Sequence, residues 1–181
     1  MNDEPCDLGL IGGVEQRRIE IVDYNPRWPA LFNAQAAVIA QALDDVALRI
    51  EHIGSTAVPG LAAKAIIDVL LVVANSADEP SYLSAMLAVG YELRVREPDF
   101  HEHRMLRTPA RDVHIHVFSS GASEIDRYLI FRDRLRSNAE DRRRYEATKR
   151  KLATQPWSDM NAYAEAKTEV IESILAAARV G

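Results

Sequence analysis

Hydrophobic and polar residues alternate with a period of two over several short stretches in the first two thirds of the chain. This alternation is typical of β-strands, because successive side chains point to opposite faces of a sheet. It predicts strands over residues 18–22, 48–53, 91–96, 104–107 and 112–118, the first of them at a sheet edge. Residues 65–73 form a nearly continuous apolar run instead, which predicts the central strand.

Other segments repeat their apolar residues at helical spacing. After Pro26 apolar side chains recur every three or four residues as far as Leu43, which predicts a first helix. A second helix is predicted between a cap at Ser76 or Asp78 and a stop at Gly90.

Everything after Ser123 is predicted to be helical. Ser123, Asn138 and Ser158 are residue types that cap helix N-termini, and Asp141 stands at the capping-box position of the second helix. We therefore expect three C-terminal helices. Strands with one or two interleaved helices, followed by a helical block, indicate an α+β (mixed α/β) fold, with a mixed sheet flanked by helices and a C-terminal helical block.

Length and composition favour one domain. A chain of 181 residues can bury a sizeable core but is short for two domains. Residues 1–15 contain three glycines and are predicted to be a flexible leader, which leaves 16–181 as the domain. The start of the chain is acidic, the wrong charge for a secretory signal, and no apolar run is long enough to cross a bilayer. With Cys6 as its lone cysteine, the protein is expected to be cytoplasmic.

Basic residues are concentrated in the C-terminal third. The formal net charge is −5, yet residues 127–151 contain ten basic and four acidic side chains. Such a segregated stretch favours an anionic ligand such as a nucleotide, although many members of a helical charge run are simply solvated or paired. Nucleic acid is a less favoured partner, because the whole chain is acidic and aromatic residues do not alternate with basic ones.

A carboxylate, Asp68, stands inside the apolar run, and the strand before it ends in the turn Gly54-Ser55. A charge in a buried strand needs a cation, a hydrogen-bond network or access to solvent. A glycine lets the backbone approach a phosphate closely, and a serine hydroxyl and backbone N–H groups donate to phosphate oxygens. The alternative for Gly54-Ser55 is an ordinary tight turn.

The segment around these residues resembles the GrpB family of the nucleotidyltransferase superfamily. It reads His52-Ile53-Gly54-Ser55-Thr56-Ala57-Val58-Pro59-Gly60-Leu61, followed by Lys64 and by Ile67-Asp68. The resemblance extends to segments 24–28, 131–136 and 162–167 in the same order. In the family a proline usually follows the lysine, and Ala65 replaces it here, which should loosen the start of the strand.

The resemblance implies a nucleotidyltransferase-like fold that binds a nucleoside triphosphate and a divalent metal ion. Gly54 and Ser55 would face the phosphates and Asp68 would bind the metal, so Ser55 and Asp68 are the candidate catalytic residues. The family implies no particular reaction. The acceptor of a nucleotidyl group, the base preference and the oligomeric state therefore stay open.

The metal site differs from that of the superfamily at one position. A second acid commonly stands two residues after the first, and this chain has Leu70 there. His114 and His116 share one face of the last predicted strand, where the superfamily often carries a third acid. They either complete a metal site with Asp68 or make ordinary hydrogen bonds. The expected ion is Mg or Mn, and the nitrogen ligands would also suit Ni or Zn.

Lysines in the C-terminal helices are candidates for holding phosphates. The candidate nucleotide-binding residues are Gly54, Ser55, Lys64, Lys149, Tyr163 and Lys167. Tyr163 precedes Lys167 by one helical turn, so both lie on the same helix face. Arg132 and Arg136 form a similar pair, and each of these side chains has an ordinary surface role as its alternative.

The remaining histidines are interpreted as structural. His52 alternates in the strand before the turn and is expected to support it, whereas His101 and His103 are expected to be solvated in an exposed connection.

Three functions remain open on these grounds: a nucleotidyltransferase-like enzyme, a non-catalytic nucleotide-binding or protein-interaction module of the same fold, and a metal-dependent hydrolase that uses Asp68, His114 and His116.

Overall fold

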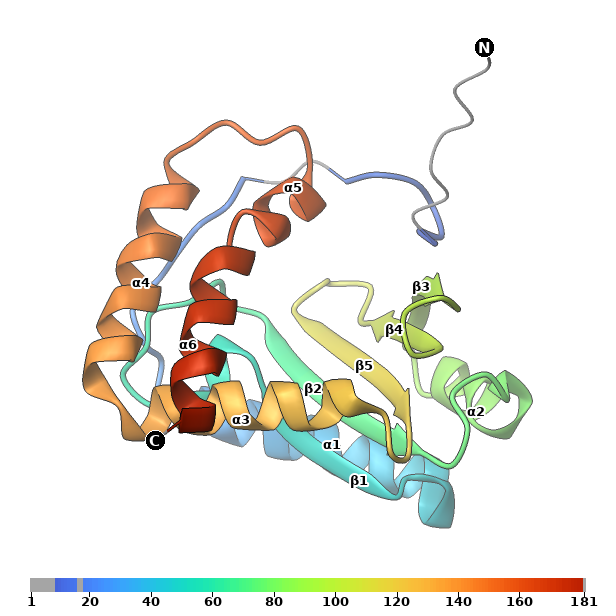
Figure 1. The fold of residues 1–181 in the computed structure, drawn as a ribbon. Coiled ribbons are helices and arrows are strands. Elements are labelled where there is room, and N and C mark those ends of the chain that lie inside the picture. Colours follow the sequence, from blue (N-terminus) through green and yellow to red (C-terminus); the bar gives the residue numbers. More distant parts are fainter. Residues whose placement is uncertain (1–8, 16–17, 181) are drawn as a thin grey trace.

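The computed structural model describes residues 9–15 and 18–180, and its centre is a five-stranded mixed sheet (Figure 1). The strands are β1 (Arg49–Ile53), β2 (Ile67–Val73), β3 (Glu92–Glu97), β4 (His103–Arg107) and β5 (Val113–Ser119). Their order in the sheet is β1-β2-β5-β4-β3. β2 and β5 run parallel, whereas the other neighbouring pairs are antiparallel.

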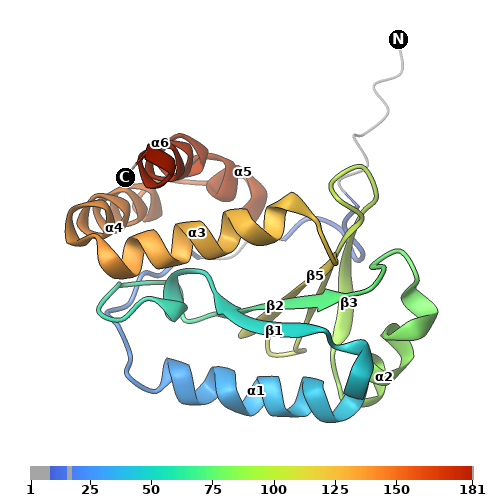
Figure 2. The same ribbon diagram turned by 60° about the horizontal axis from the view of Figure 1, so that its bottom comes forward.

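Helices cover both faces of the sheet, as Figure 2 shows. On one face lie α1 (Trp28–Leu43) and α2 (Leu83–Ala88). On the other lies the C-terminal block, made of α3 (Ser123–Ser137), α4 (Ala139–Ala153), α5 (Met160–Glu165) and α6 (Thr168–Val180). No helix in the described ranges is both long and apolar enough to cross a membrane.

Strand β2 is apolar on both faces because helices pack against each of them. Val69 and Leu71 belong to the large core cluster with α1 and α2, and Leu70 and Val72 to a smaller cluster with α3. Asp68 lies on the same face as Leu70, at the start of the strand where the α3 cluster ends. The alternation of β2 therefore turns one carboxylate toward the C-terminal helices.

The predicted fold class is confirmed, and most predicted elements are present with shifts of one or two residues at their ends. The edge strand predicted over residues 18–22 is wrong, because the described part of that segment makes only an isolated bridge between Val22 and Ala63. Ser76 does not cap a helix: its hydroxyl donates to the Glu102 carbonyl oxygen and bonds the Ser119 hydroxyl.

The C-terminal block contains four helices rather than the three predicted. A break at Ala166 and Lys167 separates α5 from α6. The N-cap of α5 is Asp159 instead of Ser158, since the Asp159 carboxylate accepts from two backbone N–H groups. The cap at Asn138 is confirmed, but the Asp141 side chain accepts from Arg134 and so forms no capping box.

The predicted leader stays a prediction. Residues 1–8, including Cys6, lie outside the described residues. Residues 9–11 run beside β3, where Ile11 N–H donates to the Arg94 carbonyl and Arg96 N–H to that of Gly9.

Candidate functional site

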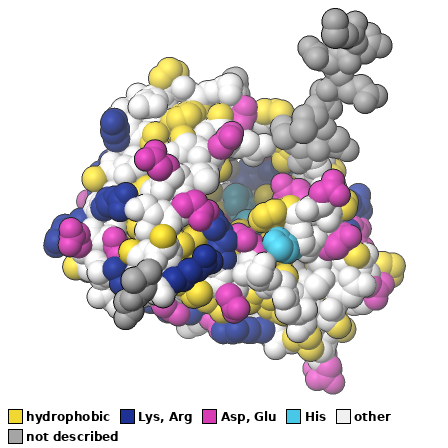
Figure 3. All heavy atoms as spheres, in the orientation of Figure 1, with side chains coloured by type: hydrophobic (Ala, Val, Ile, Leu, Met, Phe, Trp, Pro, Cys, Tyr) yellow, Lys and Arg dark blue, Asp and Glu magenta, His cyan; other side chains and the backbone are white. Residues whose placement is uncertain are grey.

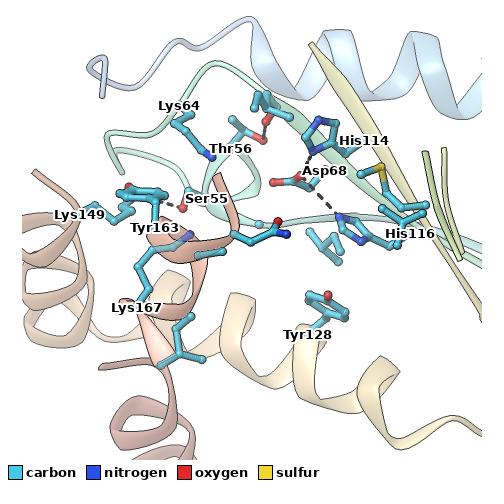
Figure 4. A pocket seen from close by; sticks show the side chains of 18 of the residues that line it. Ser55, Thr56, Lys64, Asp68, His114, His116, Tyr128, Lys149, Tyr163 and Lys167 are labelled. Atoms are coloured by element: carbon cyan, nitrogen blue, oxygen red, sulfur yellow. Dashed lines mark hydrogen bonds and ion pairs between the residues drawn. The ribbon is translucent and has the colours of Figure 1, made fainter. Parts of the chain in front are cut away.

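The Gly54-Ser55 turn is built tightly against Asp68. Gly54 has φ +70° and ψ −172°, a backbone conformation that is essentially restricted to glycine. A Cβ atom at this position would overlap the Asp68 carboxylate. Glycine is therefore required here both for backbone conformation and for space, and the turn brings the backbone of Gly54 next to the acid. Figure 4 shows the residues that follow it, Ser55 and Thr56, in the same pocket as Asp68.

Hydrogen bonds of Thr56 and His52 support this turn. The Thr56 hydroxyl donates its proton to the Ile66 carbonyl oxygen at 3.0 Å, so it accepts from Nε2–H of His52, also at 3.0 Å. The His52 ring stacks on Phe32, with 4.6 Å between ring centroids. Burial lowers the pKa of His52 to about 4, so the ring is neutral at pH 7. Its hydrogen bond to Thr56 supports the turn.

Asp68, His114 and His116 meet on one face of the sheet. The parallel pairing of β2 with β5 places His114 beside Asp68 and His116 beside Leu70. Asp68 Oδ1 lies 3.8 Å from His114 Nδ1 and 3.8 Å from His116 Nε2. Both distances exceed a normal hydrogen bond, so the three groups converge without direct contact.

The charge states of these groups suit a cation. Burial would raise the pKa of Asp68, but the neighbouring histidines and Lys64 lower it below its usual value, which keeps the carboxylate ionised. Burial lowers the pKa of His114 to about 4 despite the charge of Asp68, so its ring is neutral at pH 7. A neutral imidazole and a carboxylate are both metal ligands.

A partly buried hydrogen-bond chain orients His116. The Glu97 carboxylate accepts from His103 Nδ1–H at 2.6 Å, and His103 Nε2 lies 3.1 Å from His116 Nδ1. Burial lowers the pKa of His103, so its neutral ring uses Nε2 to accept the proton on His116 Nδ1. This arrangement leaves a lone pair on His116 Nε2, the atom that faces Asp68.

His103 corrects the prediction of a solvated residue. It opens β4 and is only 6% exposed, because β4 pairs with β5 and places it next to His116. His101 is exposed, as expected.

Lys149 reaches the glycine-serine turn from α4. Its Nζ donates to the Ser55 hydroxyl oxygen at 3.0 Å and to the Ala62 carbonyl oxygen, and it lies 4.8 Å from the centre of the Tyr145 ring. Burial, with the charge of Lys167 second, lowers the pKa of Lys149 to about 7. A buried lysine with this pKa is poised to gain a full charge when an anion arrives.

Two further lysines flank Tyr163 of α5. Lys167 Nζ lies 4.8 Å and Lys64 Nζ 5.1 Å from the centre of the Tyr163 ring. Burial and the charge of Lys64 lower the pKa of Lys167 to about 8. The Tyr163 hydroxyl is buried and has no hydrogen-bond partner among the described residues. Both the lysine pair and this hydroxyl could interact with phosphate oxygens of a ligand.

These residues line one cavity of about 490 Å³ between the sheet and the C-terminal helices. This volume lies in the range of small-molecule sites. Figure 3 shows the molecular face hollowed at this point, with basic and histidine side chains inside the hollow. The nine candidate site residues all line it: Gly54, Ser55, Lys64, Asp68, His114, His116, Lys149, Tyr163 and Lys167.

The arrangement is not that of a closed metal site. Among the described residues, no group of three or more histidine, cysteine, aspartate or glutamate side chains is positioned to hold a metal ion. Ligand atoms around a small divalent ion lie roughly 3–3.5 Å apart, a little closer than the 3.8 Å separations here. The donor types fit a metal ion, and side-chain shifts of a few tenths of an ångström would bring them into range.

The structure places Lys149 of the basic stretch in the cavity lining, whereas Arg132 and Arg136 lie outside that lining. Arg132 donates to Glu51 and Asp133, and Arg136 donates to the Ala57 carbonyl oxygen, all outside the cavity lining. Arg127, Arg132 and Arg150 of this stretch form ion pairs with carboxylates elsewhere in the fold.

The lowered pKa of Lys149 predicts a change in stability with pH. The unfolded chain binds the lysine proton below about pH 10.5, whereas the folded protein binds it only below about pH 7, so stability should fall as the pH drops through this window. We expect roughly 2–3 kcal/mol less stability at pH 7 than at pH 9 from Lys149. Urea denaturation of Lys149→Met should show a correspondingly flatter pH dependence. Lys151→Met, at an exposed position of the same helix, is the matched control, and equal slopes in all three proteins would refute the assignment.

Comparisons with known proteins agree with the resemblance found in the sequence. The family described as GrpB protein matches residues 18–177. A UPF0157 protein of Halalkalibacterium halodurans is 52% identical over 157 residues, 87% of this chain and 80% of that protein. A UPF0157 protein of Streptomyces coelicolor is 51% identical over 165 residues, 91% of this chain and 87% of that protein. The crystal structure of the conserved protein GrpB from Enterococcus faecalis superposes with a TM-score of 0.78 at 33% identity, covering 88% of this chain and 96% of that chain.

Proposed function

We propose that this chain, which belongs to the GrpB family, binds a nucleoside triphosphate together with a divalent metal ion in the cavity between the sheet and the C-terminal helices. The reaction that we propose for such a complex is transfer of the nucleotidyl group to an acceptor. The family match assigns the chain to the GrpB family, whereas the proposed function is argued from the geometry of the site.

The observation that carries the proposal is the gathering of lysines around one acid. Lys64, Lys149 and Lys167 line the same cavity as Asp68, and mutual repulsion contributes to the lowered pKa values of Lys149 and Lys167. Like charges held together in a partly desolvated cavity are unfavourable unless an anion neutralises them. A triphosphate supplies several negative charges, and it would accept hydrogen bonds from the lysines and from the orphan Tyr163 hydroxyl.

The metal ion would be held by Asp68, His114 and His116. Once bound, it would neutralise charge on phosphate oxygens that lie between it and the lysines. Ser55 and the backbone of Gly54 border both regions, because Gly54 lies against Asp68 and the Ser55 hydroxyl accepts from Lys149. The turn would therefore position the phosphate that the reaction attacks.

Leu70 supports a non-catalytic alternative. It occupies the position of the second acid and is completely buried in the apolar cluster with Phe118 and Leu129. A carboxylate at this position would be a charge buried among apolar side chains, so the surrounding core would have to change to accommodate it. A protein that binds nucleotide and metal without transfer is consistent with this feature.

The proposal is tested by thermal-shift titration of nucleoside triphosphates with Mg, Mn, Ni or Zn. A ligand present at a hundred times its dissociation constant stabilises by about 2.7 kcal/mol, which corresponds to several degrees for a protein of this size. We expect stabilisation that needs both nucleotide and metal. The absence of stabilisation by every pair would refute the proposal.

Ser55→Ala separates an enzyme from a binding module. Loss of one hydrogen bond to a charged group costs about 1.5–3 kcal/mol, or roughly ten- to a hundredfold. In an enzyme the rate of triphosphate consumption should fall at least as much as affinity, because charge on the phosphoryl oxygens shifts during transfer. In a module only affinity should fall. Product analysis separates transfer from hydrolysis by Asp68, His114 and His116, since a hydrolase releases free products without an acceptor.

A further inference from the structure

The outward face of α1 is apolar and exposed. Figure 2 shows α1 on the side of the sheet away from the C-terminal helices. None of its sixteen residues is acidic or basic. Trp28, Ile39 and Leu43 are buried in the core with the sheet, whereas Leu31 and Val38 are 50% and 39% exposed. The outward face of a surface helix normally carries charged and polar side chains, so this face differs from one that meets only water.

Four exposed positions on this face repeat at heptad spacing. Leu31, Ala34, Val38 and Gln41 follow one another at intervals of three, four and three residues, and all four are exposed. This spacing places the side chains along one line of a helix, and it is the spacing at which two helices pack in a coiled coil. We name these four residues the α1 seam. No helix of the described part of the chain covers them.

Charged residues continue the seam at both ends. Arg27 precedes Leu31 by four residues, and Asp45 follows Gln41 by four. Both are exposed, and neither forms an ion pair among the described residues. A cation at the start of a helix and an anion at its end are the reverse of what the helix dipole favours. These two charges therefore do not stabilise α1 by itself, which indicates that they interact with something outside it.

An antiparallel second copy of α1 complements the seam. With a two-fold axis beside Ala36, Val38 of each copy lies opposite Ala34 of the other, so a large side chain meets a small one. In the same alignment Arg27 of each copy faces Asp45 of the other, and both unpaired charges gain a partner. A parallel arrangement would instead place like charges together at each end, which is unfavourable. The charges thus select the antiparallel pair.

We propose that two copies of this chain associate through their α1 seams, with the two helices antiparallel about a two-fold axis. The partner is a second copy because the charges at the ends of the seam complement the same surface turned by that axis. The cavity lies on the other face of the sheet, so it stays open in the dimer and the proposal does not depend on the proposed function.

The expected dimer is reversible. One helix from each copy makes a contact smaller than the roughly 1,200 Å² of stable complexes, and complexes below this size are weak. We expect a dissociation constant of about 10–100 µM. Sedimentation equilibrium of the full chain, without nucleotide or metal, measures it between about 1 µM and about 1 mM. A wild-type chain that stays monomeric at the highest concentration overturns the proposal.

Val38→Glu tests the centre of the seam. It places a carboxylate of each copy close to the two-fold axis and should weaken association at least about tenfold. Ile130→Glu makes the same change at an exposed position of α3 and should leave association unchanged. Circular dichroism and thermal melting check that both variants are folded. If Val38→Glu associates as wild type does, the copies meet elsewhere and the proposal is wrong.

Exchange of the end charges tests the direction of the helices without changing the apolar positions. Arg27→Glu or Asp45→Arg alone brings like charges together at both ends of the dimer and should weaken association roughly two- to thirtyfold. The double variant Arg27→Glu/Asp45→Arg reverses each pair and should restore the wild-type affinity. A role of these residues within one chain gives no such restoration. Single variants without effect, or a double variant as weak as the single ones, contradict the antiparallel pairing.

Discussion

Asp68→Asn should abolish metal-dependent nucleotide binding and leave the protein folded. The amide keeps the shape of the side chain next to Gly54 but removes the charge that would hold a cation beside His114 and His116. Changes in the partners behind a metal ligand already alter metal affinity by about 10–100-fold, so loss of the ligand charge should cost at least roughly a hundredfold. Isothermal titration with metal and triphosphate measures this loss.

Metal-free titration makes the Asp68 result specific. Without metal, Asp68→Asn should bind triphosphate as tightly as wild type or more tightly, because it removes a negative charge near the lysines. Asp45→Asn, at an exposed position near the other end of β1, is the control for the change of charge. Undiminished metal-dependent binding in Asp68→Asn would show that Asp68 is not a ligand.

Gly54→Ala should be the most damaging single substitution in the turn. Alanine is strained in this backbone conformation, which is essentially confined to glycine, and its Cβ also overlaps the Asp68 carboxylate. With about 1–2 kcal/mol for the backbone and about 1–3 kcal/mol for the overlap, we expect a loss of roughly 2–5 kcal/mol in urea denaturation. Metal binding should be lost as well, since Asp68 has to move.

The comparison with Gly60→Ala separates the two costs. Gly60 also has a positive φ, of +77°, but a Cβ atom there meets no atom within 4 Å. Gly60→Ala should lower the free energy of unfolding by only about 1–2 kcal/mol and leave the affinity for metal unchanged. If the two substitutions destabilise the protein equally, the contact between Gly54 and Asp68 is not important for the fold.

Secondary structure that depends on the residues of one segment could be predicted from the sequence. Alternation located four strands, and helical spacing located α1. The segment 18–22 failed because alternation describes one buried face but does not say whether a neighbouring strand is available for pairing. The break at Ala166 and Lys167 was missed because Tyr163 and Lys167 are separated by one helical turn in sequence, a spacing that gives no sign of an interruption.

The candidate site depended more on long-range contacts. A sequence motif led to Gly54, Ser55 and Asp68, and the strand period placed His114 and His116 on one face, as the parallel pairing with β2 requires. The role of His103 could not be read from its surroundings in sequence, because it depends on the register of β4 against β5. In the observed register Met105 is the partner of His116, and His103 reaches His116 as its diagonal neighbour on the same face, a contact that pairing of these two strands does not give without the register.

The position of Arg94 was hidden for a related reason. Arg94 lines the cavity from β3, and the pairing of β3 with β4 shifts at this residue, which marks a bulge. A bulge adds a residue without a reliable sequence signal, so the alternation predicted for residues 91–96 gives no indication of it.

The two halves of the cavity come from different parts of the chain, and this has a consequence for cooperativity. Asp68 and the two histidines belong to the sheet, which is complete at Ser119, whereas Lys149 and Lys167 arrive with helices that follow. A metal ion bound to the sheet repels the lysines, and the lysines in turn disfavour the metal, so each half alone weakens the other. A triphosphate attracts both. Metal and nucleotide should therefore bind with positive cooperativity, each raising the affinity of the other by the same factor.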